Sequence, residues 1–305
     1  MKKSCRLTGQ EFEVAQEDLE FYQRLGVPSP TLHPLERQRQ RIAFRNFRSL
    51  YRRSCDGTKK QIVSMYDSDA PFPVYDTPHW WSDSWDPYSY GQEVHLERSF
   101  LDQYLELAKR VPRFSIMNVN CENCSYSNFA LESRNCYLVF GCVRNEDCQY
   151  GHIVWDCKDC IDNLYAYRCE WCSNGIDIVG CYNVHFSSET VNCRDSYFLH
   201  DCRNCSDCFG CFNLRGKEYC FFNEQLTKEE YKKRIESFLP LSHATIQNCL
   251  EWLREEAIAK AVYPPYFGEK CEDVSGNHIY EGKNLEYCFD AKRSEYSKYA
   301  FTAFG

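Results

Sequence analysis

Between residues 121 and 220, the cysteines of this chain recur on a register of three residues. All sixteen of them have numbers that leave the same remainder when divided by three. They are Cys121, Cys124, Cys136, Cys142, Cys148, Cys157, Cys160, Cys169, Cys172, Cys181, Cys193, Cys202, Cys205, Cys208, Cys211 and Cys220. Independent placement would give this agreement with a probability on the order of one in ten million, so the register is an internal repeat.

The other residues on this register are small or apolar, as at Ala130, Val154, Gly175 and Ile178, and only Lys217 is charged. Such residues are the ones that proteins bury. A strand would place them inward every two residues and a helix every 3.6. An inward period of three therefore predicts a narrow solenoid, built from short straight segments and corners.

A longer period gives the length of one coil. Cys157, Cys169 and Cys181 are twelve residues apart, and so are Cys124 and Cys136. The residue before the second of these columns is mostly Asn or Asp, which tolerate a left-handed backbone at a corner. The sequence thus predicts a mainly β fold whose centre is a β-solenoid with twelve-residue coils.

The register also divides the chain. We expect a small α+β domain over 1–112, the cysteine-rich solenoid over 113–222, a helical-hairpin insertion over 223–265 and resumed, uncapped coils over 266–305. The amphipathic segment from Glu97 to Val111 is predicted to form a helix whose apolar side covers the first coil, because solenoid ends need covering.

The overall composition excludes some functions. A net charge of −8 and a pI near 5.6 argue against general binding of polyanions by the whole molecule. The sequence shows no secretory signal and no run of eighteen apolar residues, so we expect a cytoplasmic protein that does not enter membranes. In that reducing compartment the 21 cysteines are expected to be thiols or metal ligands.

Two gapped spacings near the N-terminus resemble zinc-ligand pairs. Cys5-x-x-Thr8 goes with His33-x-x-Glu36, and Cys55-x-x-Thr58 goes with Asp76-x-x-His79. A structural zinc site takes four Cys or His ligands. Cys5, His33, Cys55 and His79 are therefore candidate metal ligands, and the alternative is a small domain in which they are simply packed.

A basic run follows the first of these spacings. On a helix, five arginines would share one face, with Phe44, Phe47 and Tyr51 between them; they are Arg37, Arg41, Arg45, Arg48 and Arg52. Such a face could contact the phosphates of a nucleic acid while the aromatic rings stack on bases. The alternative is a solvated helix face, or one paired with acidic residues.

The strings Thr8-Gly9, Glu20-Phe21-Tyr22 and Trp80-Trp81-Ser82-Asp83 resemble an uncharacterised cysteine-rich family of candidate-phylum bacteria. Members are sometimes labelled CaiB/BaiF family, although nothing here resembles that transferase fold. Residues 5–41 are also similar to a zinc-ribbon domain, from which this chain departs at Thr8, His33 and Glu36. The resemblance implies an architecture and no established activity.

Inside the predicted solenoid, CxxC pairs of adjacent coils could bind a metal. Two such pairs are expected to meet across one rung, namely Cys157, Cys160, Cys169 and Cys172, with Cys193, Cys205, Cys208 and Cys220 as a second set. Tetrahedral zinc accepts four thiolates, and an iron–sulfur cluster uses the same ligands but needs more room.

Two other readings of the interior cysteines remain open. The coil period resembles that of insect antifreeze solenoids, which suggests a disulfide ladder, but the ranks of outward threonines needed for ice binding are absent. Alternatively, cysteine serves only as a small core residue. The chain would then be a non-enzymatic scaffold that binds a protein partner or itself, since no Gly-rich phosphate loop and no nucleophile–base set is legible.

Overall fold

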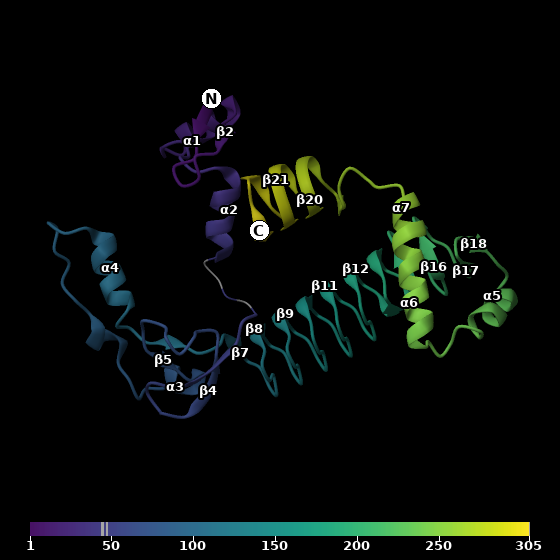
Figure 1. The fold of residues 1–305 in the computed structure, drawn as a ribbon, viewed down its shortest axis with the longest axis horizontal. Helices are drawn as coiled ribbons and strands as arrows, with labels where there is room; N and C mark the ends of the chain where they lie inside the picture. Colours follow the sequence, from purple (N-terminus) through teal and green to yellow (C-terminus); the bar gives the residue numbers. More distant parts are fainter. Residues whose placement is uncertain (44–45, 47, 305) are drawn as a thin grey trace. The chain divides into compact units, whose positions relative to one another are not determined.

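The computed structural model describes residues 1–43, 46 and 48–304, and the chain forms two compact units, Met1–Arg168 and Cys169–Gly305. The fold is mainly β, as the sequence predicts. Its largest sheet has 12 strands, of which β7 to β11 belong to the first unit and β12 to β18 to the second (Figure 1). The division between the units therefore falls inside the stretch 113–222 that the sequence predicts as one domain.

The first unit begins with a small hairpin and two helices. Strands β1 (Lys2–Ser4) and β2 (Glu11–Glu13) pair antiparallel, and α1 (Gln16–Arg24) and α2 (Pro34–Ala43) follow. Cys5, Phe12 and Val14 form its core, with Leu19 and Leu32 packed against them.

A second small motif occupies the rest of the N-terminal region. Its elements are β3 (Tyr51–Ser54), β4 (Gln61–Ser64), β5 (Val74–Tyr75), α3 (Thr77–Trp80), the 3₁₀ helix η1 (Pro87–Tyr90), α4 (Phe100–Ala108) and β6 (Arg113–Phe114). Strands β3 and β4 form an antiparallel hairpin, while β5 and β6 pair in parallel.

The first unit ends in a parallel ladder, which we call the first ladder. It comprises β7 (Asn118–Val119), β8 (Asn128–Leu131), β9 (Phe140–Val143), β10 (His152–Trp155) and β11 (Leu164–Tyr167). Each strand pairs with residues twelve positions further along, as in Asn118 with Ala130 and His152 with Leu164. This offset equals the coil length that the cysteine columns predict.

The second unit opens with the second ladder, in which the same offset recurs, as in Ile176 with Ser188. Its strands are β12 (Ile176–Val179), β13 (Tyr182–His185), β14 (Ser188–Val191), β15 (Arg194–His200), β16 (Phe209–Phe212) and β17 (Cys220–Phe221). An antiparallel strand, β18 (Glu224–Gln225), follows β17.

The backbone of both ladders turns at every third residue, which is more often than the Asn and Asp column predicts. Tyr126, Phe129 and Glu132, for example, have φ of 53°, 54° and 49°. Each stands directly before a buried residue, such as Ala130 or Ser133. The left-handed conformation thus turns the next side chain inward. Aromatic residues and Glu adopt this conformation as well as Asn and Asp.

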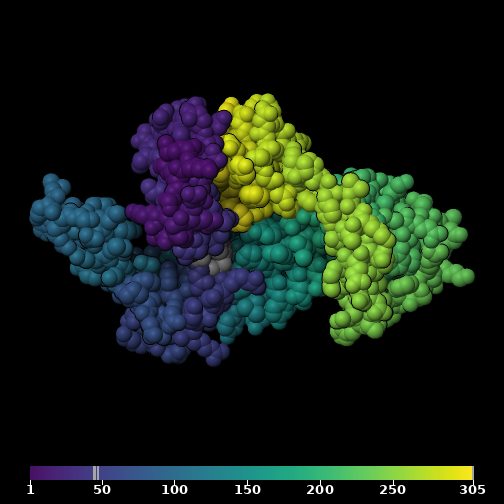
Figure 2. Space-filling model, turned by 45° about the horizontal axis from the view of Figure 1, so that its top comes forward, coloured from purple at the N-terminus to yellow at the C-terminus, as the bar shows by residue number. Residues whose placement is uncertain are grey.

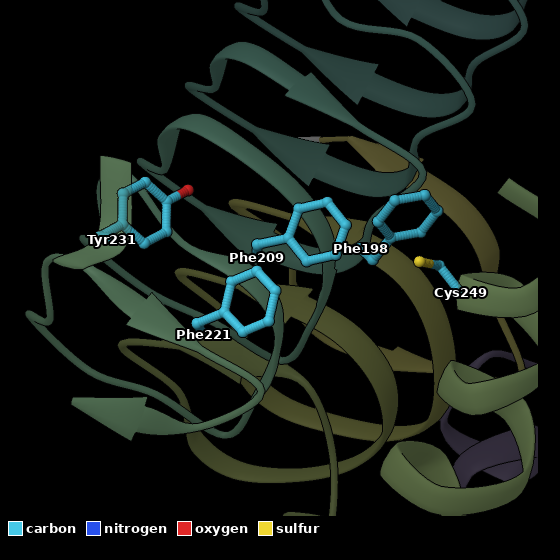
Figure 3. Close-up of a cluster of buried hydrophobic side chains, with 5 residues drawn as sticks. All are labelled: Phe198, Phe209, Phe221, Tyr231 and Cys249. Atoms are coloured by element: carbon cyan, nitrogen blue, oxygen red, sulfur yellow. The ribbon is translucent and has the colours of Figure 1, made fainter. Parts of the chain in front are cut away.

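Helices cover one side of the second ladder. They are α5 (Lys228–Ile235), α6 (His243–Trp252), the π-helical turn η2 (Leu253–Ala257) and α7 (Ile258–Lys260). Thr227 and Glu230 form the predicted capping box of α5, and Ser242 caps α6. Tyr231 of α5 and Cys249 of α6 belong to a buried hydrophobic cluster with Phe198, Phe209 and Phe221 of the ladder (Figure 3).

The C-terminal strands form the third ladder, in the new triplet phase that Leu285 and Cys288 predict. They are β19 (Gly268–Glu269), β20 (Glu272–Tyr280), β21 (Lys283–Lys292), β22 (Glu295–Lys298) and β23 (Phe301–Phe304). All pair in parallel, and Lys283 pairs with Glu295 at the twelve-residue offset.

The position of α4 corrects one expectation. This helix lies at the far end of the first unit from β9 to β11, with β5 and α3 between (Figure 1). The side chains of Phe100, Leu101 and Leu105 are 63%, 67% and 56% exposed, so they do not cover the ladder. Among the described residues, no helix has both the length and the apolar composition needed to span a bilayer.

Candidate functional site

The interior cysteines hydrogen-bond to the backbone around them. The sulfur of Cys148 lies 3.3 Å from the carbonyl oxygen of Glu146 and 3.5 Å from that of Cys157, and either oxygen can accept its proton. Ser196 shows the same geometry with a hydroxyl, which donates to the Arg194 carbonyl at 2.7 Å. A thiol therefore acts here as a small side chain that satisfies an inward carbonyl.

Of the 21 cysteines, 18 are buried. None of the described cysteines forms a disulfide in the structure. Burial raises the pKa of Cys142 to about 12, and it also raises the pKa of Cys136. These thiols are neutral at physiological pH, so they are poor nucleophiles.

The two predicted metal quartets have different outcomes. Cys157 and Cys160 belong to the first unit, and Cys169 and Cys172 to the second, so zinc or an iron–sulfur cluster on that rung stays a prediction. In the second set, the side chains of Cys193, Cys205, Cys208 and Cys220 are all buried in one unit. They do not form a group of ligand atoms within 4.8 Å of one another, as one other set of described residues does.

At the first N-terminal spacing, the predicted residues gather around the sulfur of Cys5. Hydrogen bonds from the His33 backbone and the Thr8 side chain lower the pKa of Cys5 to about 7. The Nδ1 atom of His33 accepts a hydrogen bond from Leu35 N at 3.1 Å, and Glu36 pairs with Arg39 at 2.8 Å. A metal on Cys5 and His33 stays a prediction.

At the second spacing, hydrogen bonds join all four predicted positions. The sulfur of Cys55 accepts from Thr58 N at 3.3 Å and from Asp76 N at 3.2 Å. The Thr58 hydroxyl donates to the Asp76 carboxylate at 2.6 Å, and His79 N donates to that carboxylate at 2.8 Å. This network holds the β3–β4 hairpin against α3, while a metal on Cys55 and His79 stays a prediction.

The arginines predicted to share one helical face do not lie on one helix. Helix α2 carries Arg37 and Arg41, Arg48 lies in a bend, and Arg52 lies on β3. The helix does not continue to Arg52, because the residues of β3 pair with β4 in the hairpin that contains Cys55. Arg45 lies outside the described residues. Nucleic-acid contact by these arginines stays a prediction.

Two of these arginines contact aromatic side chains of the first unit. The guanidinium of Arg37 donates to the Tyr22 hydroxyl at 2.7 Å. That of Arg48 lies over the ring of Phe140 at 5.7 Å from its centroid. Their positive charges therefore help to hold the first unit together.

One group of titratable side chains was missed by the sequence analysis, and it lies wholly in the second unit. Asp177, Glu189 and His278 each offer one ligand atom, and these atoms lie within 4.8 Å of one another. The Nδ1 atom of His278 is 3.9 Å from Asp177 Oδ1, and its Nε2 atom is 3.6 Å from Glu189 Oε1. The twelve-residue offset of Asp177 and Glu189 was the available signal, but nothing local pointed to His278.

The protonation equilibria of this group follow from its burial. Burial raises the pKa of Asp177 to about 6, and burial with repulsion from Asp177 raises the pKa of Glu189 to about 8. Burial also lowers the pKa of His278. Near pH 7 the imidazole is thus neutral and Glu189 is mostly protonated, although the distances from His278 to the two carboxyl groups are those of an ion pair.

Comparison with known proteins adds no assignment: no family model matches the chain, and no curated protein matches it. Two features of the structure are suited to binding. One is the exposed apolar face of α4, and the other is the carboxylate–histidine group of the second unit.

Proposed function

We propose that this chain is a non-enzymatic scaffold for binding and assembly, built on a cysteine-lined β-solenoid with twelve-residue coils. The parallel ladders with a twelve-residue offset support the solenoid, as does burial of the residue after each left-handed turn. The burial of 18 of the 21 cysteines supports a structural role for cysteine in a reducing compartment such as the cytoplasm.

The observation that carries the proposal is the orientation of α4. Its buried residue is Gln103, which is 3% exposed. The Gln103 amide donates to the His95 carbonyl at 2.9 Å and accepts from His95 N at 2.9 Å. The helix is thus fixed through a polar side chain, which leaves its apolar residues facing outward.

The apolar face of α4, made of Phe100, Leu101, Tyr104 and Leu105, is a continuous stripe. Each of its side chains is more than half exposed, and the rings of Phe100 and Tyr104 stack at 6.4 Å. The space-filling view shows the segment around α4, in blue, at the surface of the first unit (Figure 2). Exposed stripes of this kind mark interaction sites.

The charges beside this stripe favour a second copy of the chain as the occupant. Asp102 lies in the first turn of α4, while Lys109 and Arg110 follow its last turn. Two copies of α4 packed antiparallel would place Asp102 of each near Lys109 of the other, with the apolar stripes between them. A twofold contact of this kind is self-complementary and closes as a dimer.

The test is sedimentation velocity of the full chain over a range of concentrations. We expect a reversible monomer–dimer equilibrium that is lost in the Leu101→Lys/Leu105→Lys double variant, because burying two ammonium groups opposes association. The matched control is Val262→Lys, which changes a residue of the second unit that is 78% exposed. A wild-type chain that stays monomeric, or a double variant that still dimerises, would refute assembly through α4.

A further inference from the structure

The carboxylate–histidine group of the second unit arises where outward columns of two ladders face each other. Asp177 and Glu189 are equivalent left-handed residues of β12 and β14, twelve positions apart. His278 and Asp290 are equivalent left-handed residues of β20 and β21, again twelve positions apart. The side chains of these four residues are partly withdrawn from water.

Asp177 and Glu189 differ from other acidic residues of the second ladder in their hydrogen bonding. In the part of the chain that the structure describes, no hydrogen bond reaches the side chain of Asp177 or Glu189, which are only 21% and 17% exposed. The next acidic residue of the same column, Asp201, does have hydrogen-bond donors. Asp201 accepts two hydrogen bonds from Arg215, at 2.8 and 2.9 Å, and one from Asn213 at 2.7 Å.

The third member of the group is a nitrogen donor held in a defined orientation. The ring of His278 stacks on that of Phe267, with centroids 5.9 Å apart and planes at 17°. The backbone N–H of Phe267 is in turn fixed by Asn277, whose side-chain oxygen accepts from it at 2.7 Å. An imidazole oriented in this way beside two carboxylates has the composition of a metal site rather than of an acidic patch.

We propose that Asp177, Glu189 and His278 bind a divalent first-row transition-metal ion. Ligand atoms around such an ion at roughly 2.1 Å lie about 3 to 4 Å apart. The spacing of up to 4.8 Å seen here closes to that value with small side-chain rotations. Three protein ligands leave further positions for water, and Asp290 adds a nearby negative charge.

The ligand types select the class of ion. Imidazole suits zinc, copper, iron and nickel, while carboxylates suit harder ions, of which manganese is the first-row transition metal. The site differs from the predicted cysteine sites, because it offers no sulfur. It is also independent of α4 and of the scaffold proposal.

The test uses Mn²⁺, since this ion prefers oxygen and nitrogen ligands to the 21 thiols of the chain. The reduced, chelator-treated full chain is titrated while free Mn²⁺ is measured by electron paramagnetic resonance. We expect one tightly bound ion per chain, and binding at least tenfold weaker in Glu189→Gln and in His278→Ala. The His243→Ala variant, which changes an exposed histidine at the start of α6, should bind like the wild type.

Circular dichroism of each variant shows whether the ladders remain folded, and Asp177→Asn provides a conservative third variant. Co²⁺ provides a second readout, because thiolate ligands give intense charge-transfer absorption that carboxylate and imidazole ligands do not. The expected Co²⁺ spectrum at one equivalent lacks those bands. Absence of Mn²⁺ binding, binding unchanged in the folded variants, or a thiolate spectrum at the first equivalent would overturn the proposal.

Discussion

At the scale of single residues, the most unusual property of this chain is the left-handed backbone at every third position of its ladders. For residues other than Gly this conformation costs roughly 1–2 kcal/mol, and Asn and Asp lower that cost by bonding to their own backbone. The chain uses Asn or Asp at many of these positions, including Asn135 and Asp147, but not at Glu132. Such exceptions are sites of local strain.

Replacing one exception should therefore stabilise the protein. We expect Glu132→Asn to raise the free energy of unfolding by roughly 0.5–1 kcal/mol, because Glu132 is exposed and has φ of 49°. Urea denaturation followed by circular dichroism measures the change. Glu122→Asn is the control, since Glu122 is also exposed but lies outside the left-handed positions. Equal effects of the two substitutions would contradict the backbone argument.

At the scale of elements, the helices after the second ladder are joined to it by aromatic rings. The ring of Phe209 has neighbours at 5.2 Å in Phe198 and Phe221 and at 5.0 Å in Phe238, which follows α5. Its side chain is fully buried. The ladder thus supplies a stacked ring surface, and the helices cover it.

Truncating that ring should be severe. We expect Phe209→Ala to lower the free energy of unfolding of the second unit by about 3–5 kcal/mol, since it leaves a cavity between ladder and helices. Thermal denaturation in parallel with near-ultraviolet circular dichroism measures this loss. Phe289→Ala in the third ladder removes the same ring from a site that is 42% exposed, and its effect should be below about 1 kcal/mol. A mild effect at Phe209 would show that the helices are not packed as described.

At the scale of the whole molecule, the cysteines divide into a large protected class and a small accessible one. Only Cys121, Cys124 and Cys271 are partly exposed, and the other 18 are buried. Burial also raises the pKa of some of these thiols, to about 12 at Cys142, which slows their reaction further. Reaction with a thiol reagent should therefore follow exposure.

We expect a native titration with a disulfide reagent at pH 8 to show about three fast thiols and a slow remainder, and 21 in denaturant. Rates for the slow class should follow unfolding, because the reagent reaches those sulfurs only when a ladder opens. Mass spectrometry after brief alkylation identifies the fast class. Fewer than 21 thiols in denaturant would indicate disulfides or bound metal, contrary to the free cysteines of the structure.

The periodic parts of this protein can be predicted from its sequence. The triplet register at Cys157 and Cys169 gives the inward side chains and the twelve-residue pairing, because each rung repeats the environment of the previous one. Helix starts such as Thr227 and Ser242 can also be predicted from the sequence, because a capping side chain bonds to residues next to it in the chain. The extent of the left-handed backbone was underestimated, because only Asn and Asp reveal it by residue type.

What depends on distant contacts was decided by the tertiary structure alone. The spacing of the arginines from Arg37 to Arg52 fits one helix, but Arg52 lies on β3, which pairs with β4. The apolar stripe of α4 predicted burial, but the hydrogen bonds of Gln103 turn it outward. His278 meets Asp177 and Glu189 only because two ladders face each other, and a repeat specifies the contacts within a ladder but not those between ladders.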